Sequence, residues 1–179
     1  MKFNETSKNT IHHEYGNFLI EFEQLVLTIK ITIIALFGIQ GLKDHNYLRI
    51  VLQDQTAYPL NAKLRSLMSH YYKDEDKKFK IIDRLFILVN DIIEKRNFIV
   101  HGTSFIYSTN IDSDLIKDKI GKFGIKVEEE KLTVESLAEL TKKVKLAERK
   151  FNNLTLCIYE PDRDLNKYFS NEQLDLLKV

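Results

Sequence analysis

The segment that decides the fold is residues 79–101, which reads FKIIDRLFILVNDIIEKRNFIVH. Its isoleucine, leucine, valine and phenylalanine residues recur at three- and four-residue steps, the spacing of a helix with an apolar face. That much apolar surface needs partners on more than one side, so we expect this helix to be central. Gly102 follows directly and predicts the end of the helix, because glycine tolerates the conformations that terminate helices.

The same spacing recurs in three other parts of the chain. It predicts helices over about residues 11–37, 47–72 and 133–160. Pro59 predicts a break in the second of these, because proline lacks a backbone donor and disfavours helix at the residue before it. We expect residues 1–10 to be frayed and the tail, residues 164–179, to form one turn or a short helix.

Residues 103–131 differ from these segments. Residues 104–108 and 122–127 are short and rich in aromatic or β-branched side chains, whereas the stretch between them is polar. We expect the two to pair as a small β-hairpin joined by a long loop. The sequence therefore predicts a single all-α domain over residues 1–179, with this hairpin inserted after the third long helix.

Composition agrees with one helical domain. The chain has 179 residues, of which 44% are hydrophobic, so it can bury a sizeable core. Only two prolines and six glycines interrupt it, which favours long helices over many short strands. The formal net charge of +1 gives no sign of bulk affinity for nucleic acid, so RNA binding would need a local patch.

The sequence favours a cytoplasmic location and no association with a membrane. The single cysteine, Cys157, cannot form an intrachain disulfide, and no secretory signal pattern stands at the N-terminus. The most apolar stretch, residues 25–39, contains Lys30 and two threonines. We expect it to be a core helix, because it is too short and too interrupted to span a bilayer.

Three polar residues close the central helix: Arg96, Asn97 and His101. They suit phosphodiester chemistry, because an imidazole can exchange protons near neutral pH, a guanidinium can bind phosphate with a planar fork of donors, and an amide can orient either group. At about 100° per residue, Asn97 and His101 share a face, whereas Arg96 lies about 140° from His101. Arg96 must therefore reach round the helix or act across a subunit boundary.

The same residues have an ordinary structural explanation. Basic and amide side chains in a last helical turn satisfy terminal carbonyl groups and interact favourably with the helix dipole, an effect of about 0.3–1 kcal/mol per charge. On spacing alone this explanation is the stronger of the two. The residues by themselves leave the function open.

An arginine, a polar residue, three more residues and a histidine at the end of a long apolar helix resemble the R-x4-6-H motif of the HEPN family. Residues 18–25 (FLIEFEQL) resemble the first long helix of bacterial HEPN domains of the abortive-infection and toxin type. The similarity in layout covers about residues 15–158, although only the short motif is specific. It implies an up-and-down bundle of four to five helices.

The resemblance implies a metal-independent endoribonuclease that acts as a toxin or antiviral effector and needs no cofactor. His101 would transfer protons, Arg96 would bind the phosphate and Asn97 would position them, leaving a 2′,3′-cyclic phosphate on the RNA. The expected partners are an RNA substrate, a second copy that completes a composite active site, and an antitoxin or regulatory protein. The alternative is a non-catalytic module that uses the same residues to bind nucleotide or protein, or to dimerise.

Several other residues are candidates for supporting roles. Glu21 or Glu23 could approach the motif from the first helix, as an acidic residue does in some family members, and we favour Glu21. Tyr107 could stack on a base or belong to a hairpin core. A basic cluster on the last long helix could hold an RNA backbone or simply be a solvated face: Lys142, Lys143, Lys145, Arg149 and Lys150. His12 and His13 invite a metal site but lack a second ligand pair, so we predict none.

Overall fold

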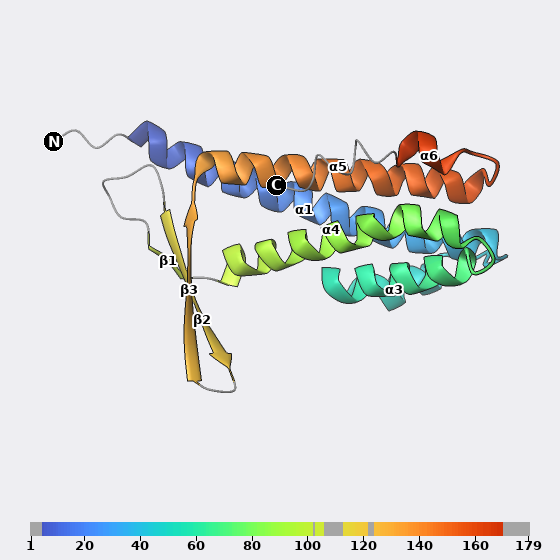
Figure 1. Cartoon of the computed structure of the whole chain (residues 1–179), viewed down its shortest axis with the longest axis horizontal. Helices are drawn as coiled ribbons and strands as arrows, with labels where there is room; N and C mark the ends of the chain where they lie inside the picture. The colour runs from blue at the N-terminus through green and yellow to red at the C-terminus, as the bar shows by residue number, and fades with distance from the viewer. Residues whose placement is uncertain (1–4, 102, 106–112, 122–123, 170–179) are drawn as a thin grey trace.

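The computed structural model describes residues 5–101, 103–105, 113–121 and 124–169 of the chain (Figure 1). The chain is mostly helical, as predicted, with a small antiparallel sheet between the fourth and fifth helices. The elements in order are α1 (Glu5–Ile39), α2 (Asn46–Gln53), α3 (Ala57–Tyr71), α4 (Asp76–His101), β1 (Thr103–Phe105), β2 (Ser113–Gly121), β3 (Gly124–Leu132), α5 (Val134–Tyr159) and α6 (Leu165–Tyr168).

The first helix is longer than predicted. It begins at Glu5, so residues 5–10, which we expected to be frayed, are helical. A glycine in the left-handed conformation ends this helix. Gly41 has a φ of 96°, and the Leu42 amide donates to the Phe37 carbonyl at 3.1 Å. This is the hydrogen bond that closes a helix ending in a left-handed residue.

Helix α1 is long enough that its relation to a membrane has to be considered again. Residues Ile11–Ile39 form a stretch that is long enough to cross a bilayer, and its most apolar 18 residues have a mean hydropathy of 1.8. Our judgement of length, which considered residues 25–39 alone, therefore underestimated the apolar helix. Half of these 18 residues are buried inside the molecule. A helix buried to that extent against other helices is typical of a protein core.

The break in the second predicted helix comes earlier than Pro59. Helix α2 ends at Gln53 and α3 starts at Ala57, so Pro59 lies in the first turn of α3. Backbone N–H groups in a first turn have no partner within the helix, so a proline there removes no helical hydrogen bond. We predicted a break at Pro59, whereas this proline lies in the first turn of a helix and the break precedes that helix.

The long helices form a bundle in which α1 and α5 lie side by side (Figure 1). Glu21 of α1 pairs with Lys145 of α5 at 3.0 Å, and further along Thr32 meets Thr155 at 2.8 Å. Residue numbers rise together on both helices, so α1 and α5 are parallel. Phe86 of α4 packs against Phe151 of α5, with ring centres 5.7 Å apart, and joins α4 to the same core.

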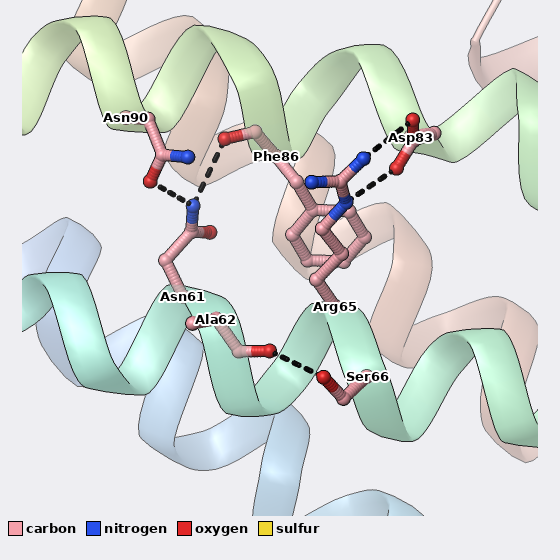
Figure 2. A network of polar contacts seen from close by, with 7 residues as sticks. All are labelled: Asn61, Ala62, Arg65, Ser66, Asp83, Phe86 and Asn90. Atoms are coloured by element: carbon pink, nitrogen blue, oxygen red, sulfur yellow. Dashed lines mark hydrogen bonds and ion pairs between the residues drawn. The ribbon is translucent and has the colours of Figure 1, made fainter.

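Helix α3 runs antiparallel to α4 and is joined to it by polar contacts (Figure 2). The buried Asn61 amide nitrogen donates to the Phe86 carbonyl and to Asn90 Oδ1, both at 2.9 Å. About one turn further along α3, the Arg65 guanidinium donates to both carboxylate oxygens of Asp83 in α4, at 2.7 and 3.0 Å. Because apolar ridges can slide by a turn, these directional bonds determine which turns of the two helices face each other.

The predicted hairpin is wrong in its pairing. The polar stretch that we assigned to a loop contains β2, which pairs with β1 on one side and β3 on the other. The hairpin is therefore β2–β3, in register from Ser113↔Leu132 to Gly121↔Gly124. The polar composition of β2 made this strand look like a loop in the sequence, although its register sets Lys117 opposite Glu128, a combination of opposite charges that antiparallel strands accommodate.

The start of α5 agrees with the sequence prediction, and its end is tied to α6. Thr133 accepts a hydrogen bond from the Ser136 amide, and Ser136 Oγ accepts one from the Thr133 amide, which is a capping box. At the far end, the buried Lys150 side chain donates to the Tyr168 carbonyl and lies 5.4 Å from the centre of the Phe169 ring. The short tail helix predicted from the sequence is confirmed as α6.

The α3–α4 contact generates a stability prediction. Asn61→Ala should destabilise the fold by about 1–2 kcal/mol, because it leaves a cavity and removes the donor that meets Asn90. Ser66→Ala is the matched control: its exposed hydroxyl donates to the Ala62 carbonyl of its own helix, so the change in the free energy of unfolding should stay within about 0.5 kcal/mol. Urea unfolding monitored by circular dichroism measures both, and equal free energies of unfolding for the two variants would contradict this role of Asn61.

Candidate functional site

The three motif residues lie where the bundle joins the sheet. His101 is the last residue of α4, and β1 begins at Thr103. Figure 1 shows that this end of α4 points toward the sheet, which stands across one end of the helices. His101 is exposed there, whereas Arg96 and Asn97, a turn earlier, are partly buried. The site thus lies at a junction between two kinds of structure, open to solvent at its histidine.

Arg96 is held mainly by α1. Its guanidinium carbon lies 5.3 Å from the centre of the buried Phe22 ring, within the range of a cation–π contact. Its Nη2 faces a carboxylate oxygen of Glu23 at 3.9 Å, and Nη1 donates to Asn97 Oδ1 at 3.3 Å. The side chain is 25% exposed, and its Nε is buried with no hydrogen-bond partner among the described residues. The guanidinium therefore presents only its outer edge to solvent.

The structure does not bring Arg96 and His101 into contact. Within the described part of the chain, the imidazole of His101 makes no hydrogen bond or ion pair, whereas Arg96 is directed toward α1. This agrees with the 140° offset on the helix and leaves His101 free to meet a ligand or a second subunit. Arg96 and Asn97, by contrast, form one connected unit.

Of the two glutamates on α1, Glu23 is the one that approaches the motif. Glu21, which we favoured, points to the other side of the helix, where it pairs with Lys145 of α5 at 3.0 Å. The two positions differ by about 200° round a helix, so they face different neighbours. Sequence reasoning also missed Phe22, which its helical stripe assigns only to the core. No signal in the sequence identifies an arginine from a distant helix as its neighbour.

The basic cluster on α5 is smaller than the sequence suggested. Lys150 is buried and bonds to the tail, so it cannot meet a ligand at the surface. Its burial, with repulsion from Arg149, lowers the pKa of its side chain. Lys142, Lys145 and Arg149 are exposed, although Lys145 is already paired with Glu21, and Lys143 is half-buried with a partner. The remaining exposed cations therefore make a narrow line along one face of α5.

The other candidates gain little support. Tyr107 lies outside the described residues. His12 and His13 are exposed near the start of α1. Among the residues that the structure describes, no group of three or more His, Cys, Asp or Glu side chains is arranged to hold a metal ion.

Cys157 is the only thiol of the chain, and its setting predicts low reactivity. The side chain is buried in α5, and burial raises its pKa, so little thiolate forms near neutral pH. We expect a disulfide reagent such as DTNB to label the folded protein at least about 100-fold more slowly than the urea-unfolded protein. Equal labelling rates would show that the Cys157 thiol is accessible in the folded protein and would contradict this prediction.

Comparison with other proteins gives no family assignment. No protein-family model, no curated protein and no solved structure matches this chain. The features that bear on function are therefore the motif, its position at the end of α4 and the contacts of Arg96.

Proposed function

We propose that this protein is a HEPN-type, metal-independent endoribonuclease that acts in the cytosol as a toxin or antiviral effector. The observation that carries the proposal is the position of Arg96, Asn97 and His101 in the last turns of the central helix α4, with the histidine exposed. The HEPN-like arrangement of the bundle, the RNA substrate and control by an antitoxin or regulatory protein belong to the same proposal.

The residues have the chemistry that RNA cleavage requires. A ribose 2′-OH attacks the adjacent phosphorus, the P–O5′ bond breaks, and the products are a 2′,3′-cyclic phosphate and a free 5′-hydroxyl. The His101 imidazole would take the 2′-OH proton or give one to the leaving 5′-oxygen. Arg96 would stabilise the negative charge on the phosphoryl oxygens in the transition state, and Asn97 would hold the Arg96 guanidinium at its present position.

The proposal includes a second copy of the chain. One motif offers one histidine, whereas the reaction uses both a base and an acid, so two motifs related by a two-fold axis would supply the pair. The separation of Arg96 from His101 within one chain fits this arrangement, since the arginine of one motif can serve the histidine of the other. The exposed position of His101 at the end of the bundle leaves it accessible to such a partner.

A non-catalytic binding or dimerisation module is the alternative, and one observation favours it. The Arg96 side chain is three-quarters buried and packed on Phe22, which is also how an arginine braces a structure. In that case His101 would contribute to assembly or to nucleotide binding and not to bond cleavage. The two functions differ in what happens when the imidazole alone is removed.

The test is cleavage of a panel of fluorescent RNAs in EDTA by the wild type and by His101→Ala. We expect the variant to lose at least about 100-fold in rate, the usual range for a general acid–base residue, while keeping its fold and its mass in solution. His70→Ala is the matched control, because His70 is also an exposed histidine in the last turn of a helix, α3. It should cleave like the wild type.

The other outcomes are equally informative. Equal cleavage by the wild type and His101→Ala would contradict the proposal that this motif cleaves RNA. Absence of cleavage by all three folded proteins, together with a change in mass or melting temperature only in His101→Ala, would favour the binding module.

A further inference from the structure

We propose that Phe22 and Glu23 of α1 control the access of a phosphate group to Arg96. Phe22 is a positioning residue that holds the guanidinium in one orientation. The Glu23 carboxylate occupies the place that an incoming phosphate would take, so the ligand must displace it. This inference rests on the proposed role of Arg96 as a phosphate-binding residue and adds a means by which that role is restrained.

The contact with Phe22 limits how Arg96 can bind a ligand. The ring is 3% exposed and lies 5.3 Å from the guanidinium carbon, so it covers one side of the group. Nε is buried, and Nη1 is engaged by Asn97. The outer edge at Nη2 is what remains for an external anion. These contacts hold the flexible Arg96 side chain in one orientation with one donor edge exposed. Because the side chain is already ordered, it loses less conformational entropy when an anion binds.

Glu23 stands at that edge. Its carboxylate oxygen lies 3.9 Å from Nη2, too far for a hydrogen bond but near enough for electrostatic attraction. Its side chain is 66% exposed, so it can turn into solvent with little loss of buried surface. A phosphate that replaces it would form shorter, charge-assisted hydrogen bonds with the same donor. Until then, the carboxylate reduces the positive potential that an anion meets.

A simple orienting role for Glu23 makes the opposite prediction. If the carboxylate served only to aim Arg96, removing its charge would loosen the guanidinium and weaken anion binding. If it competes with the phosphate, removing its charge strengthens binding. Glu23→Gln separates the two, because glutamine keeps the length and hydrogen-bonding capacity of the side chain and loses only the charge.

The experiment uses the full chain and a fluorescein-labelled 2′-O-methyl oligoribonucleotide, which cannot be cleaved because it lacks free 2′-hydroxyls. Binding is followed by fluorescence anisotropy. We expect Glu23→Gln to lower the Kd about three- to fivefold, the upper part of the range for one exposed charge pair. Glu14→Gln, the same charge change about two and a half turns away on α1, should leave the Kd within about twofold. The advantage of Glu23→Gln should shrink at high salt.

The role of Phe22 has its own readout. In a ¹H–¹⁵N spectrum, the buried Arg96 Nε–H should be shifted by the aromatic ring and protected from exchange with water. Phe22→Leu should move this signal toward the position of exposed arginines and raise the Kd. Phe151→Leu is the control, since Phe151 is an equally buried phenylalanine whose ring lies against Phe86 in the core. It should cost similar stability and leave the Arg96 signal in place.

Three results would overturn the inference: weaker or unchanged binding by Glu23→Gln relative to Glu14→Gln, no binding by either the wild type or Glu23→Gln, or an Arg96 signal that Phe22→Leu does not move. The proposed function fails separately. If His101→Ala cleaves RNA as the wild type does while Glu23→Gln binds more tightly, only the catalytic proposal is lost. If His101→Ala is inactive and Glu23→Gln changes nothing, only the restraint by Glu23 is lost.

Discussion

Burial of α1 along its length is the constraint on which the rest of this structure depends. Its apolar residues face the core in more than one direction, and the polar Thr28 and Thr32 are buried as well. A hydroxyl in such a place needs a partner, and Thr32 has two: the Thr28 carbonyl and the Thr155 hydroxyl of α5, each at 2.8 Å. The contact with Thr155 helps to hold α5 in register along α1, and α5 in turn packs on α4 through Phe151 and Phe86.

The same helix connects the core to the candidate site. Phe22 contributes to the buried cluster and also lies against the guanidinium of Arg96, while the next residue, Glu23, reaches the solvent edge of that guanidinium. Any change that rotates or shifts α1 would therefore alter the setting of Arg96 directly. His101 is different, because it is exposed at the end of α4 and no described side chain forms a hydrogen bond or ion pair with it. The site combines one side chain held by the fold with one that is open to a partner.

The position of the sheet follows from the order of the elements along the chain. It is inserted between the end of α4 and the start of α5, so it stands next to the exposed histidine (Figure 1). Strands β2 and β3 are rich in charged residues, and their antiparallel register sets Asp114 opposite Lys131 and Lys117 opposite Glu128. A ligand or second subunit that reaches His101 would meet this edge of the sheet as well as the bundle.

The sequence by itself determined the helical class, the extent of α4, the start of α5 and the short tail helix. These features depend on local patterns, namely helical spacing, capping side chains and the conformational freedom of glycine. The motif residues were also identified from the sequence, because they are neighbours along one helix.

Only the tertiary structure decided the rest. The pairing of β2, the burial of Lys150 and the choice of Glu23 over Glu21 each depend on which segments distant in sequence lie next to one another. Two glutamates two residues apart look equivalent in a sequence, but a helix turns them to different sides, and the neighbours on those sides are chosen by packing of the whole core. For the same physical reason, the contact of Arg96 with Phe22 could not be predicted from either helix alone.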